Sequence, residues 1–199
     1  TYIKDSLEQN TKNEEYSYLY LDNNNSFFLS LNKFKSDSAL SQAKKSNFNS
    51  TTLLSRPKFN SNFNFLIKKN LKKDSIIYKE KIAGIGNFVY REENTFKGKW
   101  NLSSKESLNI IDNITHKAYI SYGGRNWTAW YANNISISDG PYKFNGLPGL
   151  ILKIYDDKKQ YVFEAVGIEK INVPEDLDNN YLSQIIITDR LKFNTIKKN

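Results

Sequence analysis

Residues 138–155 constrain the fold more than any other stretch, because a segment dense in glycine and proline runs directly into an apolar run. Three of the nine glycines and two of the four prolines lie within residues 140–149. Pro141 and Pro148 fix their own φ angles and push the residues before them toward extended conformations. The apolar run 150–155 is typical of a well-buried strand. The sequence therefore predicts a loop of one fixed shape that leads into a core strand.

Short apolar segments separated by turn residues make up most of the remaining chain. Residues 96–102 alternate most regularly between apolar and polar side chains, which predicts a strand with one buried face. Gly123-Gly124 separates two strand-like segments and predicts a hairpin turn. A helix is predicted within residues 37–45, capped by Ser36 or Asp37. Further strands are predicted at 16–21, 27–31, 63–67, 75–82, 88–90, 108–114, 117–122, 125–133, 161–168 and 181–188.

This pattern of short strands at hairpin spacing predicts a mainly β fold. We expect a single curved antiparallel sheet of about eight to eleven strands, half-barrel or open barrel-like, with a short helix and long loops. One of these long loops is expected at 46–62. The length of 199 residues suits a single domain, 1–199. Residues 1–14 and 189–199 are expected to be frayed or peripheral.

Composition narrows the classes of partner and compartment. The formal net charge is +8, but the lysines are scattered along the chain, which indicates a solvated surface and disfavours nucleic acid. The absence of cysteine excludes disulfides and thiolate chemistry. No run approaches the ~18 apolar residues of a membrane-spanning helix. The chain lacks methionine and opens at Thr1, so we expect a mature or trimmed chain whose leader has been removed.

No group of residues in the sequence has the pattern of a catalytic or metal site. His116 is the only histidine, and without cysteine a transition metal would depend on carboxylates. Asp139 precedes a glycine and fits a turn. Asp156 and Asp157 lack the pattern of a calcium loop and fit a solvated turn. We therefore predict no catalytic residue, no metal and no cofactor.

An aromatic segment supplies the candidates for ligand or partner binding. Trp127, Trp130 and Tyr131 are bulky residues within one predicted strand, which indicates a strand covered on both faces. The alternative is that one face lines a groove, where Arg125 would pair with a ligand carboxylate. Tyr142, in the glycine- and proline-rich loop, completes the candidate set.

The segment Gly146-Leu147-Pro148-Gly149-Leu150-Ile151 spells the signature of the GLPGLI family, and its surroundings also resemble that family. Upstream lie Asp-Gly-Pro-Tyr-Lys-Phe at 139–144, Ile-Ser-Ile at 135–137 and the aromatic strand 127–131. The resemblance is specific over residues 100–168 and weak over 15–36. Near Lys117-Ala118, where the family often has a cysteine, this chain has Thr115-His116. The residues expected to form the structural signature are Gly140, Pro141, Gly146, Leu147, Pro148, Gly149, Leu150 and Ile151.

The resemblance implies an exported protein of Bacteroidetes, in the periplasm, at the cell surface or secreted, and it carries over no catalytic residue. Three function classes stay open. An aromatic-rich curved sheet would suit a non-enzymatic module that binds an apolar molecule, lipid or peptide. An exposed apolar patch would instead indicate an envelope assembly protein with a protein partner. A hydrolase would require paired carboxylates in a cleft.

For the signature itself we expect a primarily structural role. Leu147 and Leu150 should be buried, because a rigid loop can seat both side chains with little entropy to lose. Gly149 should have either a positive φ or no room for a Cβ atom. Trp127, Trp130 and Tyr131 should pack near the loop.

Overall fold

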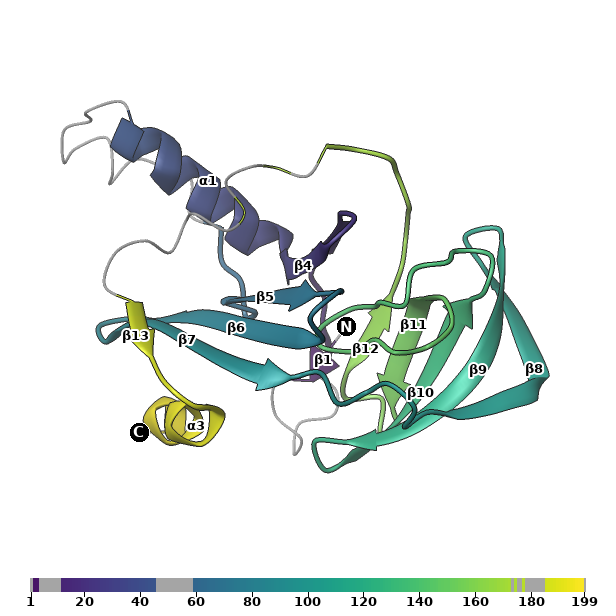
Figure 1. Cartoon of the computed structure of the whole chain (residues 1–199). Coiled ribbons are helices and arrows are strands. Elements are labelled where there is room, and N and C mark those ends of the chain that lie inside the picture. Colours follow the sequence, from purple (N-terminus) through teal and green to yellow (C-terminus); the bar gives the residue numbers. More distant parts are fainter. Residues whose placement is uncertain are drawn as a thin grey trace. The chain divides into compact units, whose positions relative to one another are not determined.

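The computed structural model describes residues 2–3, 12–45, 59–172, 174, 177 and 185–198. The chain divides into two compact units, which are described separately (Figure 1). The five-stranded unit comprises residues 1–14 and 94–171, and the six-stranded unit comprises residues 15–93 and 172–199. The six-stranded unit is thus discontinuous in sequence, and most of the five-stranded unit is inserted between its two segments.

In the five-stranded unit all strand pairs are antiparallel, and the sheet order is β12-β11-β10-β9-β8. The strands are β8 (Asn101–Ile110), β9 (Asn113–Tyr122), β10 (Arg125–Ala132), β11 (Leu150–Asp156) and β12 (Val162–Glu164). Gly123 and Gly124 both have positive φ between β9 and β10, which confirms the predicted hairpin turn. The short strands β1 (Tyr2–Ile3) and β2 (Lys12–Asn13) pair with each other.

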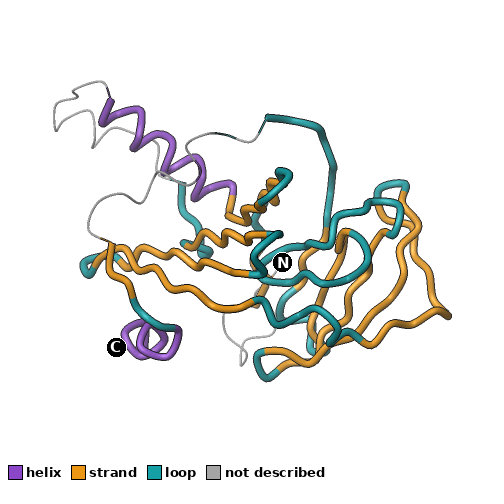
Figure 2. Tube along the Cα trace, viewed as in Figure 1, coloured by secondary structure: helices purple, strands orange, loops and turns teal. Residues whose placement is uncertain are grey.

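In the six-stranded unit the sheet order is β13-β7-β6-β5-β4-β3, and β13 runs parallel to β7. The strands are β3 (Ser17–Leu21), β4 (Asn25–Ser30), β5 (Phe65–Asn70), β6 (Ser75–Ile82), β7 (Gly86–Glu93) and β13 (Ile185–Ile187). The helices are α1 (Leu31–Lys45) and α3 (Arg190–Lys198). The described chain is mainly β, with one mixed and one antiparallel sheet of several strands (Figure 2).

The expectation of a single sheet is wrong, whereas the mainly β, antiparallel-rich character is confirmed. The continuous series of hairpins does not distinguish one sheet from two. The break falls at residues 94–100, which form a loop before β8, although a strand was predicted over 96–102. The apolar side chains of Phe96 and Trp100 are buried although they lie in a loop, and this burial accounts for the strand-like pattern. Gly98, in the turn between them, has a φ of 74°. Neither of the larger sheets closes into a barrel in the described structure.

The helix α1 begins earlier than predicted, at Leu31 instead of residue 37. Its cap is Ser30, whose Oγ accepts a hydrogen bond from the backbone N–H of Lys33 at 3.2 Å. Asp37 lies inside the helix, 2.6 Å from the Nζ of Lys33, as an i,i+4 ion pair. Most of the loop expected at 46–62 and the first half of the strand expected at 181–188 lie outside the described residues.

The C-terminal residues, for which a frayed or peripheral tail was expected, include α3. Phe193 of this helix is buried with its ring centroid 5.5 Å from those of Tyr78 and Tyr90 and 5.8 Å from that of Phe88. Within the described part of the chain, neither helix has the length and apolar character needed to cross a membrane.

Candidate functional site

The register of the five-stranded sheet separates its side chains onto two faces. Directly opposed residues of an antiparallel pair lie on the same face, and successive residues alternate. Ala129 lies opposite Ala118 on one side and Ile154 on the other, and all three are fully buried, so they mark an inner face. Thr128 lies opposite Tyr119 and Tyr155, which therefore share the outer face.

The loop of residues 138–149, which leads into β11 and is called the signature loop here, packs against the inner face of the sheet. Phe144, fully buried, lies with its ring centroid 4.6 Å from that of Trp127. Leu147 and Leu150 are 1% and 6% exposed, which confirms their predicted burial. These contacts make the loop part of the hydrophobic core of the unit.

Close packing leaves no room for a Cβ atom at any of the three glycines of the loop, and Gly146 also has a φ of 87°. A Cβ atom at Gly149 would overlap the carbonyl oxygen of Ala132 and lie 2.7 Å from its carbonyl carbon. The prediction that Gly149 has no room for a Cβ atom is therefore confirmed. A Cβ atom at Gly140 would lie 2.7 Å from the Cβ of Ile151, so the loop also approaches the following strand too closely for a side chain.

Asn145 ties the loop to the segment that precedes β8. Its Oδ1 accepts a hydrogen bond from Asn94 Nδ2 at 2.7 Å, and its carbonyl oxygen accepts one from Trp100 Nε1 at 2.8 Å. Its own Nδ2 donates to the carbonyl oxygen of Lys143 at 2.9 Å. Pro148 is exposed, but most of the loop is enclosed by protein, which supports a structural role.

Three of the five predicted binding residues, Trp127, Trp130 and Tyr131, are buried. Trp127 is buried in the core, where its Nε1 donates to the carbonyl oxygen of Tyr122 at 3.0 Å. Tyr131 is also buried, and burial raises the pKa of its phenol. Tyr142 lies in the loop with a φ of 52°, 6.1 Å from the ring of Phe144.

Trp130 and Arg125 contact other residues of the protein. Trp130 lies on the outer face beneath the Nζ of Lys117, 5.4 Å from its ring centroid. Arg125 Nη1 lies 2.5 Å from the buried carboxylate of Asp156 and 2.5 Å from Gln160 Oε1. Arg125 therefore pairs with a carboxylate of the protein itself.

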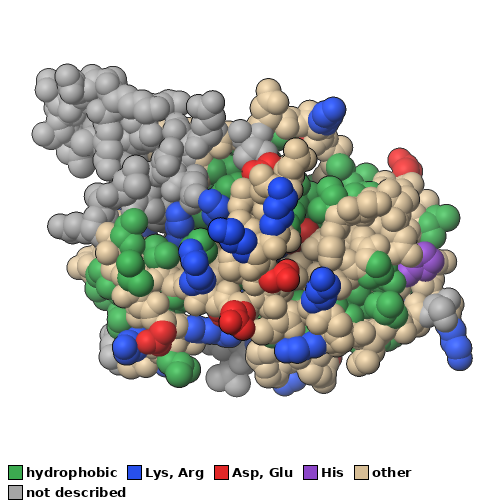
Figure 3. All heavy atoms as spheres, viewed as in Figure 1, with side chains coloured by type: hydrophobic (Ala, Val, Ile, Leu, Met, Phe, Trp, Pro, Cys, Tyr) green, Lys and Arg blue, Asp and Glu red, His purple; other side chains and the backbone are tan. Residues whose placement is uncertain are grey.

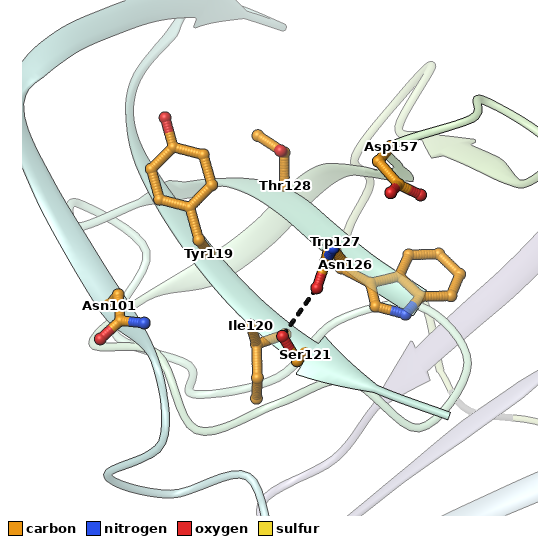
Figure 4. A pocket seen from close by; sticks show the side chains of 8 residues that line it. All are labelled: Asn101, Tyr119, Ile120, Ser121, Asn126, Trp127, Thr128 and Asp157. Carbon is orange, nitrogen blue, oxygen red and sulfur yellow. Dashed lines mark hydrogen bonds between the residues drawn. The ribbon is translucent and has the colours of Figure 1, made fainter. Parts of the chain in front are cut away.

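A shallow hollow of about 190 Å³ opens on the outer face, and sequence reasoning missed it. Figure 4 shows Tyr119 and Thr128 on one side of the strands, with Ile120 on the other. Ile120 and Trp127 complete the lining, although their side chains are mostly buried. The residues that give the hollow its polar chemistry are Asn101, Tyr119, Ser121, Asn126, Thr128 and Asp157, and we call this set the polar hollow.

Local hydrogen bonds connect residues that line the polar hollow. Ser121 Oγ donates to Asn126 Oδ1 at 2.7 Å across the β9–β10 pair (Figure 4). The backbone N–H of Asp157 donates to the carbonyl oxygen of Asn126 at 2.9 Å, which places the turn after β11 beside β10. Polar residues alternate at 119, 121, 126 and 128 around the Gly123-Gly124 turn, but any solvent-exposed strand face has this pattern, so it did not single out a site.

Charge is balanced around this face. Lys117 donates to Glu106 at 2.8 Å, and this hydrogen bond raises the pKa of Lys117 above its usual 10.5. Lys153 forms an ion pair with Glu164 at 3.0 Å. Figure 3, a view of the whole chain, shows blue Lys and Arg side chains with fewer red Asp and Glu side chains among them. Among the described residues, no three His, Asp or Glu side chains are grouped in a way that could hold a metal ion.

The five-stranded unit is thus an open β-sheet with a small polar hollow on its outer face. A family model described as a protein of unknown function (Porph_ging) matches residues 91–153, which span β8 to β10, the signature loop and the start of β11. No curated protein matches the chain.

Solved structures show the same fold. Two structures of PNGF-II, in different space groups, align with a TM-score of 0.65 each at 16% and 17% identity. They cover 94% and 92% of this chain but 30% of PNGF-II, so the chain spans less than a third of the length of that protein. At this identity the likeness shows the fold alone.

Proposed function

We propose that the chain is an exported, non-enzymatic binding protein of the GLPGLI family that recognises its ligand at the polar hollow. Family membership is supported by the signature at 146–151, which falls inside the matched segment 91–153. Export is supported by the family resemblance alone. Fractionation of the full gene product in its host tests it, and recovery in the cytoplasm would contradict it.

One observation carries the binding role. Strands β8, β9 and β10 and the turn after β11 gather six polar side chains around an open hollow, while the aromatic candidate Tyr131 is buried. A few convergent polar groups are the usual means by which a site orients its ligand. This arrangement favours a ligand rich in hydrogen-bonding groups over a purely apolar molecule or lipid.

A second candidate, an envelope module with a protein partner, is favoured by a different segment. Val166, Ile168 and Ile171, which follow β12, are 77%, 52% and 48% exposed. Exposed apolar side chains at such short spacing are a common feature of protein contact surfaces. Loss of a copurifying protein on replacing Val166 and Ile168 with Ser would favour this alternative.

Native mass spectrometry of protein isolated from its own host tests the binding role. We expect a copurified small molecule on the parent and its loss in Asn126→Ala, which removes an amide from the polar hollow. Asn109→Ala is the matched control, since Asn109 is exposed on β8 outside the hollow. Equal retention by both variants, or no bound mass on the parent, would contradict the proposed site.

The hydrolase alternative can be tested in the same preparations. Asp157 is the single carboxylate that lines the hollow, whereas a hydrolase with paired carboxylates needs two. Asp157 is therefore the residue to replace in a test for hydrolysis. We expect Asp157→Asn to leave any copurified molecule chemically unchanged. Accumulation of a larger, uncleaved molecule on Asp157→Asn would instead assign an enzymatic role.

A further inference from the structure

We propose, on the basis of the proposed function, that the polar hollow binds one ring of a neutral, polyhydroxylated ligand, as in a carbohydrate chain. The inference rests on the chemistry, size and position of the hollow, together with the charges around it.

The lining chemistry matches hydroxyl groups. Tyr119 and Thr128 supply hydroxyls that can donate and accept, and Asn101 supplies an amide with a separate donor and acceptor. The Ser121 hydroxyl donates its proton to Asn126 Oδ1, so its oxygen is available as an acceptor. Because Asn126 Oδ1 accepts from Ser121, its Nδ2 group is oriented as a donor. A ring with several neighbouring hydroxyls can satisfy donors and acceptors spaced this closely.

The size of the hollow selects a small group. Its volume of about 190 Å³ is below the ~300–1,000 Å³ typical of pockets that enclose a whole drug-sized ligand. Four of the lining residues, Asn101, Ser121, Asn126 and Asp157, are exposed to solvent. These features suit a single ring of a longer chain, with its neighbours continuing across the outer face.

Tyr119 adds an apolar surface to the rim. Its side chain is on the outer face and the residue is 38% exposed, so one part of the ring is open to a ligand. The Nζ of Lys117 lies 5.4 Å from the ring centroid, which restricts the orientation of the tyrosine. A sugar ring presents hydroxyls at its edge and C–H groups on its faces, and it can use both kinds of contact here.

Charge argues for a neutral ligand. Asp157 is the charged residue of the lining, and its carboxylate would repel an anion such as a phosphate or a uronate. The cations on the same face, Lys117 and Lys153, are held by Glu106 and Glu164. An anionic chain therefore finds no unpaired cation among these outer-face residues.

Position argues against an added peptide strand. The hollow lies over β9 and β10, which are both interior strands of the sheet, with neighbours on each side. Their backbone groups are engaged in the ladder, whereas a peptide that adds a strand needs a sheet edge.

The test is an amide NMR titration of the full chain with four neutral hexasaccharides, of glucose, mannose, N-acetylglucosamine and xylose. The matching monosaccharides and an uncharged hexapeptide of glycine and serine are titrated alongside. We expect at least one hexasaccharide to shift the signals of Asn101, Tyr119, Asn126 and Thr128. Asn126→Ala should weaken that binding at least tenfold, and Asn109→Ala should leave it unchanged.

The remaining outcomes are also decisive. Equal affinity for a monosaccharide would assign a free sugar as ligand, and binding by hexasaccharides alone would assign a chain. Shifts at the hollow with the peptide alone would overturn the carbohydrate inference and leave the proposed binding role standing. No shift at these residues with any saccharide at millimolar concentration would also overturn the inference. The proposed binding role is tested independently by native mass spectrometry of the Asn126→Ala and Asn109→Ala variants.

Discussion

Arg125 Nη1 lies 2.5 Å from Asp156 Oδ2, so the first residue of β10 holds the last residue of β11. Asp156 is fully buried and also accepts a hydrogen bond from the backbone N–H of Tyr161 at 2.9 Å. The guanidinium of Arg125 lies 4.9 Å from the Tyr161 ring centroid. This cluster closes the β11–β12 turn and explains why an arginine follows the glycine turn.

Replacement of Arg125 with Met should destabilise the protein by about 2 kcal/mol. Removing one partner of a buried pair costs roughly 3–5 kcal/mol, and the side chain of Arg125 is still 32% exposed, which reduces the loss. Urea unfolding measures the change. The double variant Arg125→Met/Asp156→Leu should recover part of the loss, because it removes the stranded carboxylate. A cost within error of zero for the single variant would contradict the assignment.

Gly149→Val should cost more than about 2 kcal/mol, because the new side chain would overlap the backbone of Ala132. Gly167→Val is the matched control. A Cβ atom at Gly167 meets nothing within 4 Å, and this variant should unfold close to the parent. If Gly149→Val were as stable as the parent but lost its ligand, the loop would be a recognition surface.

Trp130→Ala should destabilise the protein by about 3 kcal/mol, since Trp130 is 8% exposed although it lies on the outer face. The loss includes its packing beneath Lys117. Trp130→Phe should cost clearly less, because an aromatic ring is retained. A cost below about 1 kcal/mol for the alanine variant would mean that this side chain lines an open groove.

The buried phenol of Tyr131 predicts a dependence of stability on alkaline pH. Burial raises its folded-state pKa above the usual 10.0, so the folded state holds its proton more tightly than the unfolded state. Its contribution is fully present below pH 10 and is lost as pH rises through the folded pKa. The difference in unfolding free energy between the parent and Tyr131→Phe should therefore shift against the parent above pH 10. A difference that is flat with pH would refute the burial effect.

Asp189 should control the start of α3. Its Oδ1 accepts a hydrogen bond from the backbone N–H of Lys192 at 2.8 Å, which is the main cause of its lowered pKa. The cap is present above pH 3.8 and is lost as pH falls through the lower folded pKa. Asp189→Ala should speed amide exchange in residues 190–198 at neutral pH. Glu169→Ala, an exposed change outside the helix, should leave that exchange unaltered.

The sequence predicted most strands correctly because hairpin turns leave local signals. Gly123-Gly124 and the 75–82 segment are examples in which turn chemistry and alternation agree with the structure. The number of sheets was not predictable in this way, because it depends on whether β7 pairs with β8, which local patterns do not encode. Residues 96–102 alternate as a strand would, but Phe96 and Trp100 are apolar because they pack around the loop near Phe144.

The candidate site shows the same limit. Burial of Leu147 and the tight fit of Gly149 followed from loop chemistry. Arg125 pairs with Asp156, and Trp130 packs beneath Lys117. Each pair joins residues of two different strands, so their proximity depends on how the strands pair. The polar hollow was missed because hydroxyl and amide residues on an exposed face carry no signal that distinguishes a site from ordinary surface.

Insertion of the five-stranded unit into the six-stranded one has a kinetic consequence. Arg190 and Glu92, which face each other where α3 begins, are 98 residues apart. During synthesis from the N-terminus, the edge of β7 has to wait for β13 to emerge, while β8 to β12 can already form hairpins. An unpaired edge is a template for aggregation. A chain truncated after residue 171 would thus lack β13 and leave the edge of β7 unpaired. We expect chaperone protection to matter most during the interval before β13 is synthesised.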